Sequence, residues 1–368
     1  MKPIRILHVV PNMNSGGIEN LIMNLYRNID RNKVQFDFLV HYHKRGVFDN
    51  EIEQLGGKIY RFSIREDNNI IKYIKQVDDF FKRHRNEYNI IHGHMASLGV
   101  VYLGIAKKYD IPIRIAHSHG TSYLKTIKGY MKYILFKLTK YKANVYYSCS
   151  TEAGQYLFGN NRNFEIIPNA INMEKFEYNE DVRKILREEL DLKEKLVIGN
   201  VGRFNLQKNH EFIIDIFNEI KKKKSNSILL LIGIGEEEKR IRQKVKEMKL
   251  EESVRFLGLR NDVERLYQAM DIFLMPSLFE GLPLTGIEAQ ASKLKCIFSD
   301  TITKEVKITN NVEFLSLKLP EKKWADKILE VKNYDRKSVE ITNKDFDIRE
   351  LAKKMEKVYI EYNKRKKE

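Results

Sequence analysis

The sequence contains few cysteines, little proline and no long apolar run. Its 368 residues include two cysteines, seven prolines and one tryptophan. Cys149 and Cys296 each lie in a short apolar stretch, so we expect buried thiols in a reducing compartment rather than a disulfide. The apolar start Ile4–Val10 is too short for a signal peptide. No uncharged segment approaches the roughly 20 residues of a membrane-spanning helix, so we expect a soluble or at most peripheral, cytoplasmic protein.

Several common site signatures are also missing. The glycines near the N-terminus lack the spacing of a dinucleotide site. Two His-x-His pairs occur, but no third ligand follows at a suitable spacing, so we expect no bound metal and no cofactor. No recognition helix, aromatic RNA-binding motif or zinc finger is present, which argues against a nucleic-acid partner.

The length and the order of segments predict two α/β domains. A chain of 368 residues is too long for one ordinary core. Short β-branched runs alternate with helical patterns in both halves, which is typical of parallel sheets covered by helices on both faces. Pro168 and Asn169 interrupt the pattern, so we place one Rossmann-like domain at 1–172 and a second at 173–347. Residues 348–366 have apolar positions at helical spacing and predict an amphipathic terminal helix.

Charge is distributed unevenly between these halves. The net charge is +16, and residues 1–172 carry 25 Lys and Arg against 14 Asp and Glu. Such a basic first half suits an anionic partner, such as a membrane surface, a diphosphate lipid or a nucleic acid.

A glycine turn follows the first predicted strand. Gly16 and Gly17 precede a helical pattern, so backbone amides at the helix start can face an anion. An ordinary turn between strand and helix has the same appearance, and this motif alone does not separate the two.

Two cations follow the first strand of the second half. Arg203 comes directly after Gly202, and Lys208 lies five residues further on. Ligands bind at the carboxyl ends of strands in open α/β sheets, and a diphosphate leaving group needs fixed positive charge there. The alternative is a pair of solvated loop cations.

A second motif, Glu280 to Glu288, follows a later strand. We expect Pro283, which has no backbone N–H, in the first helical turn. Open backbone amides of the surrounding residues then form a diphosphate cradle, supplied by Gly281, Leu282, Leu284 and Thr285. Glu280 and Glu288 are candidates to accept hydrogen bonds from the donor sugar and from the nucleotide ribose. Each glutamate, taken alone, is more often a helix-start or surface residue.

Histidines cluster at predicted strand ends in the first half. His92 and His94 follow one strand, and His117 and His119 follow the next. Since metal is not expected there, we interpret them as hydrogen-bonding partners for a sugar.

In these motifs the sequence resembles the retaining GT-B glycosyltransferases of family four, over nearly the whole chain. The motifs lie in the family's order: the Gly-Gly-Ile-Glu turn, His119, the Gly202–Asn209 stretch and the Glu280–Glu288 element. The stretches Ser150–Gly154 and Glu288–Ser292 resemble enzymes of bacterial capsule and exopolysaccharide synthesis.

The resemblance implies two domains facing each other across a cleft, with a metal-independent hexosyl- or N-acetylhexosaminyltransferase activity. The donor is then a nucleotide-diphosphate sugar, with a uridine carrier as the family-based choice, held by the second domain near Arg203 and Lys208. Glu280 contacts the sugar and Glu288 the ribose. Gly16 and Gly17 lie near the diphosphate and the acceptor, and the terminal helix crosses back to the first domain.

The resemblance also implies the roles of the histidines and the stereochemistry. His119, or else His117, contacts the sugar from across the cleft, and His94 lies in the same sugar region. Retention in this family is assigned to front-face attack guided by the leaving diphosphate, so no general base is named.

Two other functions fit parts of the sequence. A nucleotide-sugar epimerase has the same two-domain shape, and a non-catalytic lipid- or nucleic-acid-binding protein fits the basic first half. Intact Arg203, Lys208, Glu280 and Glu288 argue against the non-catalytic interpretation.

Residues 121–147 contain six lysines and no acidic residue. Apolar residues recur among the lysines at helical spacing, with several tyrosines, which is typical of a membrane-surface helix. We expect the first domain to dock on the inner face of a bacterial plasma membrane and the acceptor to be a lipid-diphosphate-linked saccharide. The alternative is a core-packed helix with a solvated lysine face.

Overall fold

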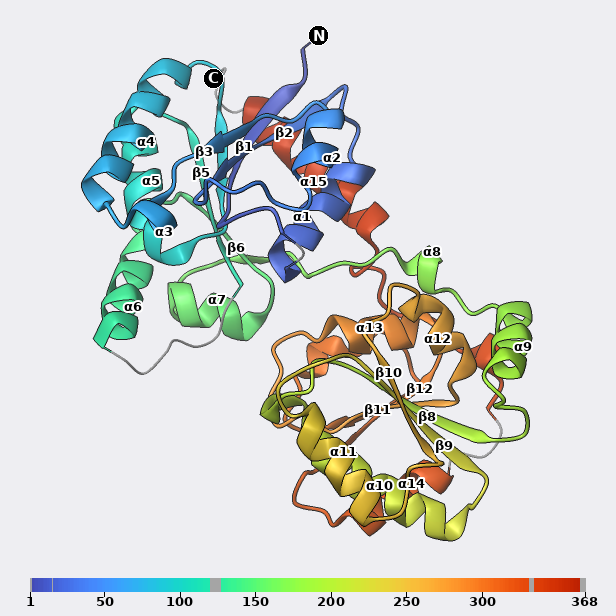
Figure 1. The fold of residues 1–368 in the computed structure, drawn as a ribbon. Coiled ribbons are helices and arrows are strands. Elements are labelled where there is room, and N and C mark those ends of the chain that lie inside the picture. The colour runs from blue at the N-terminus through green and yellow to red at the C-terminus, as the bar shows by residue number, and fades with distance from the viewer. Residues whose placement is uncertain (1, 15, 120–126, 331–333, 365–368) are drawn as a thin grey trace. The chain divides into compact units, whose positions relative to one another are not determined.

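The chain forms two compact α/β units. The computed structural model describes residues 2–14, 16–119, 127–330 and 334–364. One unit comprises Met1–Ala170 and Asp345–Glu368, and the other comprises Ile171–Lys344 (Figure 1). The observed division falls two residues before the expected one at 172/173. The terminal segment belongs to the first unit.

The first unit contains a seven-stranded, fully parallel sheet. Its strand order is β3-β2-β1-β4-β5-β6-β7. This is a doubly wound order, in which strands are added on one side of β1 up to β3 and on the other side from β4 onward. The strands are β1 Ile4–Val9, β2 Val34–Val40, β3 Ile59–Arg61, β4 Ile90–Gly93, β5 Ile113–Ser118, β6 Val145–Ser148 and β7 Glu165–Ile166.

Helices cover both faces of this sheet. On one face α1, α2 and α15 pack against the strands, and on the other face α4, α5 and α7 do so (Figure 1). The helices are α1 Gly17–Asn28, α2 Asp49–Gln54, α3 Ile64–Asp67, α4 Ile70–His84, α5 Ala96–Lys108, α6 Ile127–Thr139, α7 Thr151–Phe158 and α15 Ile348–Lys364.

The terminal helix α15 packs into the first unit's core. Its apolar positions recur every three or four residues, so they lie on one face of the helix. Leu351, Met355 and Tyr359 on this face are buried, whereas Lys353 and Lys357 are exposed. Because α15 contacts α1 and the strands β1, β2 and β4, the chain's end completes the core that its beginning forms.

The second unit repeats the doubly wound plan with a six-stranded parallel sheet. Its order is β10-β9-β8-β11-β12-β13, with the change of side between β8 and β11. The strands are β8 Leu196–Val201, β9 Ser227–Ile232, β10 Val254–Gly258, β11 Ile272–Met275, β12 Lys295–Ser299 and β13 Val312–Leu315.

Helices also cover both faces of the second sheet. Helices α10, α11 and α14 lie on one face, while α12 and α13 lie on the other (Figure 1). The helices are α8 Met173–Phe176, α9 Glu180–Glu189, α10 His210–Lys223, α11 Glu238–Glu247, α12 Val263–Ala269, α13 Leu284–Ala291 and α14 Glu321–Glu330, with 3₁₀ turns at Leu206–Lys208, Lys304–Val306 and Arg336–Ser338.

The expected fold class of two doubly wound Rossmann-like domains is confirmed. Cys149 and Cys296 are both buried, as expected. Within the described ranges, no helix combines the length and the apolar character that crossing a membrane requires.

Replacing Met355 by Ala tests the contribution of α15. Met355 is fully buried, so its loss leaves a cavity and we expect the free energy of unfolding to fall by ~2–5 kcal/mol. The measurement is denaturant unfolding followed by circular dichroism. Lys357→Ala, an exposed position on the same helix, serves as the control and should change stability by less than about 0.5 kcal/mol. Equal stability of both variants would show that α15 is dispensable.

Candidate functional site

Parallel pairing places the carboxyl ends of all strands of a sheet at one edge. Ligands of open α/β sheets bind at this edge, next to the strand where the winding reverses. In the second unit that position is the carboxyl end of β8 and β11, which is followed by Gly202 and by the loop leading to α13. In the first unit it is the carboxyl end of β1 and β4, which carries Gly16, Gly17 and His94 on the segments that follow.

Arg203 begins the loop after β8 and is largely exposed. Its guanidinium lies 3.0 Å from the Glu236 carboxylate, and both side chains are more than half exposed. An exposed ion pair of this kind contributes little stability. An anionic ligand can therefore bind Arg203 in place of Glu236 with little loss of stability.

Lys208 lies in a 3₁₀ turn and is much less accessible. The Asn205 side chain caps this turn by accepting a hydrogen bond from the Lys208 backbone amide. Lys208 Nζ donates to Glu280 Oε1 at 2.6 Å, and the two side chains are 14% and 8% exposed. A Cβ atom on Gly202 would come within 3.2–3.4 Å of the Lys208 stem, so glycine leaves room for this lysine to reach Glu280.

The helix after β11 begins one residue later than expected. Pro283 is the N-cap of α13, not part of its first turn, and the helix starts at Leu284. The reason is that Pro283 has an extended backbone, with ψ at 110°. The first helical hydrogen bonds are donated to the Pro283 carbonyl by Gly286 and Ile287, so the amides of Leu284 and Thr285 precede the bonded part of the helix.

Glu288 lies in the second turn of α13. Its carboxylate accepts a 3.0 Å hydrogen bond from the Tyr267 hydroxyl. Burial raises the pKa of Glu288, against the lowering effect of that bond. The Glu288 carboxyl group is thus held in a fixed position and is weakly solvated. Both conditions strengthen a hydrogen bond that it accepts.

A cavity of about 610 Å³ opens at the same edge of the second sheet. Gly202 and Arg203 contribute to its wall, and the remaining wall was not anticipated from the sequence: Ile232, Gly233, Ile234, Gly235, Glu236, Leu259, Arg260 and Val263. Val263 lies one turn before Tyr267 on α12, and Tyr267 is the residue whose hydroxyl bonds to Glu288.

Glycine is required in the wall of this cavity. Gly233 has φ +137°, and a Cβ there would come within 2.0 Å of the Gly202 carbonyl oxygen. The Gly-x-Gly spacing of Gly233 and Gly235 directly after β9 is the sequence signal that could have identified the segment.

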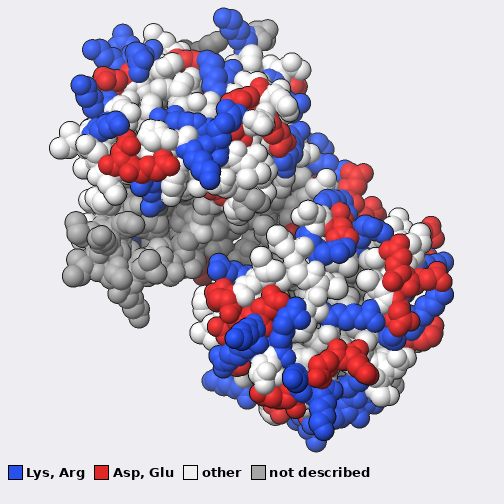
Figure 2. Space-filling view, in the orientation of Figure 1, with Lys and Arg blue, Asp and Glu red and all other residues white. Residues whose placement is uncertain are grey.

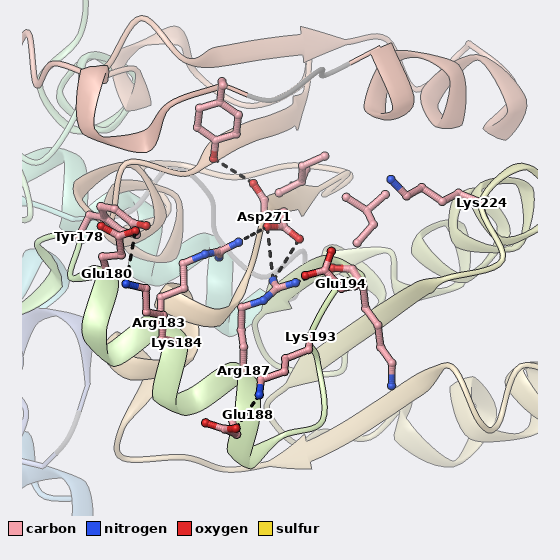
Figure 3. A pocket seen from close by; sticks show the side chains of 14 residues that line it. Tyr178, Glu180, Arg183, Lys184, Arg187, Glu188, Lys193, Glu194, Lys224 and Asp271 are labelled. Atoms are coloured by element: carbon pink, nitrogen blue, oxygen red, sulfur yellow. Dashed lines mark hydrogen bonds and ion pairs between the residues drawn. The ribbon is translucent and has the colours of Figure 1, made fainter.

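A second cavity, of about 780 Å³, lies at the opposite edge of that sheet. Figure 3 shows Arg183 and Arg187 pointing at Asp271, and the atoms lie 2.5 Å and 3.3 Å apart respectively. Arg187 also donates to the carbonyls of Leu192 and Lys195. Arg183 and Arg187 already bond to groups of the protein. The cavity also lies at the amino ends of the strands, whereas ligands of open α/β sheets bind at the carboxyl ends, so we assign it no ligand.

The expected anion site at α1 is occupied by a side chain of the same helix. Gly16 is the N-cap and Gly17 the first helical residue, as expected. The Glu19 carboxylate lies over Gly16, where a Cβ would meet Glu19 Oε2 at 2.3 Å. Burial raises the pKa of Glu19. An anionic ligand at this turn must therefore displace Glu19 or bind beside it.

The histidines of the first unit form one cluster at the carboxyl edge. His92, His94 and His117 are buried at 2%, 6% and 2% exposure, whereas His119 is only partly buried. Of the two histidines predicted to contact the sugar, His119 is therefore the more exposed and His117 the more buried, and the contact itself remains a prediction. His8 of β1, not identified from the sequence, completes the cluster, and its Nδ1 lies 3.1 Å from His94 Nε2.

We expected no metal because no third ligand follows the His-x-His pairs at a suitable spacing in the sequence, but the fold brings a third histidine to each of two groups. Ligand atoms of His8, His92 and His94 lie within 4.8 Å of one another, as do those of His94, His117 and His119. The third ligand comes from a neighbouring strand, which sequence spacing does not show. These nitrogens already bond to each other at 2.9–3.1 Å, so metal independence remains a prediction.

Burial keeps the cluster uncharged. Desolvation lowers the pKa of His8 and of His119 to about 3. It lowers the pKa values of His92, His94 and His117 well below the usual range, and the neighbouring histidines add to this effect. At neutral pH all five rings are therefore hydrogen-bonding groups without charge.

Comparison with protein families matches both units. The model "Glycosyltransferase Family 4" matches residues 15–175, and the model "Glycosyl transferases group 1" matches residues 182–346. The Bacillus subtilis protein EpsF, named as a glycosyltransferase, is 34% identical over 336 residues, which cover 88% of this chain and 86% of EpsF.

One further relative and one solved structure extend this likeness. The Escherichia coli "UDP-Gal:alpha-D-GlcNAc-diphosphoundecaprenol alpha-1,3-galactosyltransferase" is 27% identical over 63% of each chain. The crystal structure of Anabaena HepE in complex with UDP superposes with a TM-score of 0.73, at 16% identity over 99% of this chain and 98% of HepE. The GT-B fold expected from the sequence is thereby confirmed.

The buried histidines predict a specific dependence of stability on pH. Their folded pKa values lie below the unfolded value of about 6.5, so only the unfolded chain takes up these protons. Stability is then complete above pH 6.5 and is lost as pH falls, by up to ~1.4 kcal/mol per pH unit for each histidine.

Denaturant unfolding of the first unit between pH 7.5 and 5.5 measures this slope. Constant stability over this range would contradict a neutral buried cluster.

Proposed function

Since the chain belongs to the family 4 glycosyltransferases, we propose that it moves a hexosyl or N-acetylhexosaminyl group from a UDP-linked donor to a saccharide carried on a lipid diphosphate. The reaction proceeds with retention of configuration, as the resemblance implies, and it serves cell-surface polysaccharide synthesis. The named substrates of the Escherichia coli relative and the UDP bound by HepE support these choices.

The observation that carries this proposal is the combination of charges and cavity at one edge of the second sheet. The cavity lined by Gly202, Arg203 and Gly233 has room for a nucleoside. Arg203 and Lys208, with the first amides of α13, then supply positive charge where the leaving diphosphate develops its negative charge. Glu288 accepts from the ribose hydroxyls, and Glu280 accepts from those of the sugar.

The first unit supplies the acceptor side in this proposal. His119 contacts the transferred sugar, and the Gly16–Gly17 turn lies next to the acceptor. A neutral His119 suits a sugar hydroxyl, because it can donate or accept a hydrogen bond and carries no charge that would attract the phosphate. The two cations and the helix amides replace a divalent metal, so transfer continues in excess EDTA.

Helix α6 supports a membrane-bound acceptor. Tyr130, Ile134, Leu135 and Leu138 are 40–57% exposed on this helix, and Tyr141 just beyond it is 61% exposed. They lie on the outer face of α6, whereas Phe136 packs against the first unit's core and Thr139 is buried, so the alternative of a core-packed helix with a solvated face stays open. Ile70, Ile71 and Ile74 at the start of α4 are exposed too.

The structure describes only some of the lysine side chains on and around α6. Lys137 and Lys140 bend back to the carbonyls of Tyr156 and Phe158. Lys125 lies outside the described residues, and so do the side chains of Lys128 and Lys132. On the face shown in Figure 2, basic side chains outnumber acidic ones on the first unit, whereas the two signs are interspersed on the second. We propose docking on the anionic inner face of the bacterial membrane.

A panel of donors tests the activity itself. Purified protein is incubated with UDP-glucose, UDP-galactose and their N-acetylhexosamine counterparts, together with a GlcNAc-diphosphate lipid. We expect one donor to give a product whose anomeric configuration matches that of the donor, with equal turnover in excess EDTA. Loss of turnover in EDTA that a single divalent ion restores would assign a metal to the histidines.

Removing either cation should reduce turnover without unfolding the protein. Arg203→Ala and Lys208→Gln each take away a fixed charge from the leaving group, so we expect kcat to fall by ~10²-fold or more. Glutamine keeps a hydrogen bond to Glu280. Arg240→Ala on α11 removes a similarly exposed, ion-paired cation and should stay within about twofold of wild type. Wild-type turnover in both site variants would exclude these residues as the diphosphate site.

Vesicle co-sedimentation tests the docking surface. Binding should require anionic lipid and weaken at high salt, because each lysine near an anionic leaflet contributes about 1 kcal/mol. It should fall when Ile134 and Leu138 are both changed to Ser, and also when Lys125, Lys128 and Lys132 are changed to Gln. Ile185→Ser, an exposed isoleucine of the second unit, is the matched control. Equal binding to neutral and anionic vesicles would refute the proposal.

A further inference from the structure

Gln207 joins the loop after β8 to the loop after β11 by three hydrogen bonds. Its backbone carbonyl accepts a 2.8 Å bond from the Leu278 amide. Its side-chain Nε2 donates to the Phe279 carbonyl at 2.9 Å and to Glu280 Oε2 at 3.1 Å. One residue of the first loop therefore bonds to three consecutive residues of the second.

The partners of the Gln207 side chain determine which end of its amide is the nitrogen. A backbone carbonyl and an ionised carboxylate can only accept hydrogen bonds, and Nε2 carries the two N–H groups of this amide. The alternative orientation would place an amide oxygen against two other oxygens. The two N–H groups are therefore directed at Phe279 and Glu280.

The Glu280 carboxylate has a different hydrogen-bonding partner at each oxygen. Lys208 Nζ lies 2.6 Å from Oε1, and Gln207 Nε2 lies 3.1 Å from Oε2. Among the residues that the structure describes, no other side chain bonds to this carboxylate. Because the Glu280 side chain is only 8% exposed, water compensates little for the loss of either partner.

Other contacts hold the backbone of the second loop without reaching the carboxylate. The Ser277 carbonyl accepts hydrogen bonds from the hydroxyls of Ser299 and Thr301, at 2.6 Å and 2.8 Å. The backbone of Glu280 forms an isolated parallel bridge with Ile302. Removing the side-chain amide on the neighbouring loop should therefore leave this loop in place and free only the carboxylate.

The two partners of Glu280 differ in how they respond to a UDP-sugar. In the proposed function the Lys208 ammonium group pairs with the diphosphate, so Glu280 Oε1 loses its partner. Gln207 is uncharged and gains no comparable attraction to a phosphate, so its bond to Oε2 can persist. The carboxylate then keeps its orientation and presents Oε1 to the sugar.

We propose that Gln207 is a positioning residue, which holds Glu280 Oε2 while Lys208 pairs with the diphosphate, so that Oε1 accepts a hydrogen bond from a sugar hydroxyl. This inference rests on the proposed function, which places Glu280 against the sugar. Gln207 acts through Glu280 and needs no contact with the substrate. A carboxylate that is already ordered loses less conformational freedom on binding, which strengthens binding.

The substitution Gln207→Met removes the amide but keeps the length of the side chain and the backbone bond to Leu278. With the full chain and each UDP-sugar of the panel, calorimetry should show dissociation constants about tenfold higher than for the wild type. Gln243→Met on α11 is the matched control, since Gln243 is exposed and its amide donates to Glu247 at 2.9 Å. The control should stay within about twofold of the wild type.

The transfer assay distinguishes positioning from displacement of the loop. In Gln207→Met we expect KM for the active UDP-sugar to rise about tenfold while kcat stays within about threefold, because the bound sugar orders Glu280 again. A displaced loop would also move Lys208 away from the leaving group and lower kcat. A fall in kcat as large as the rise in KM would overturn the positioning role.

A double-mutant cycle with Glu280→Ala tests whether Gln207 acts through Glu280. The bond to the Phe279 carbonyl is lost in Gln207→Met in either background, whereas the bond to Glu280 exists only when the carboxylate is present. We expect Gln207→Met to weaken UDP-sugar binding about tenfold in the wild type but less than about twofold in Glu280→Ala. Equal effects in both backgrounds would overturn the inference.

The variant Glu280→Ala, taken alone, tests the proposed function. If its affinity for every UDP-sugar, relative to UDP, equals that of the wild type, Glu280 does not contact the sugar and that part of the proposed function is refuted. If this relative affinity falls but Gln207→Met binds like the wild type, only the positioning role is refuted. Thermal unfolding checks the fold of each variant, and Gln207→Leu, which also lacks the amide, replaces Gln207→Met if that variant unfolds.

Discussion

Parallel strand pairing is the constraint on which both candidate sites depend. In the first sheet β1 pairs with β4 so that His8 lies opposite His92, although 84 positions separate them in the sequence. In the second sheet the same geometry brings Lys208, after β8, to Glu280, after β11. A helix crossover returns each strand in the same direction, so the segments after all strands emerge at one edge. Shifting one register would separate the histidines and leave their nitrogens unpaired in the core.

The two cations at the carboxyl edge of the second sheet, Arg203 and Lys208, form ion pairs with carboxylates of the protein. The exposed pair of Arg203 and Glu236 is screened by water, but Lys208 and Glu280 are largely desolvated, so separating them without replacement is costly. In the proposed reaction one ligand replaces both halves of this pair. Its diphosphate pairs with the Lys208 ammonium group, and its sugar hydroxyls donate hydrogen bonds to the Glu280 carboxylate. A nucleoside diphosphate without the sugar would leave the Glu280 carboxylate uncompensated, which favours the complete donor over the product.

The sequence predicts those parts of the fold that depend on local pattern. Most residues of Leu196–Val201 and Ser227–Ile232 are apolar, and both segments form buried strands. Val312–Leu315 carries no comparable local pattern, because Glu313 interrupts a run of only four residues at the sheet edge. Pairings between distant segments have no local signal, and for that reason His8 was not recognised. The Gly233–Glu236 wall of the cavity near Arg203 does have a local signal, the Gly-x-Gly spacing after β9, but two glycines alone do not identify a binding site.

The burial of the histidine cluster gives the two units complementary chemistry. Unpaired polar atoms in a core cost about 1–3 kcal/mol each, and three ring nitrogens of this cluster have no partner among the described residues. A fully solvated histidine would be protonated in a fraction of molecules near neutral pH. An imidazolium in the sugar region would attract the donor's diphosphate and compete with Arg203 and Lys208. Burial prevents this by holding the pKa of His119 near 3. In the proposed reaction the permanent charges bind phosphate on the second unit, while a neutral imidazole on the first unit contacts a sugar hydroxyl.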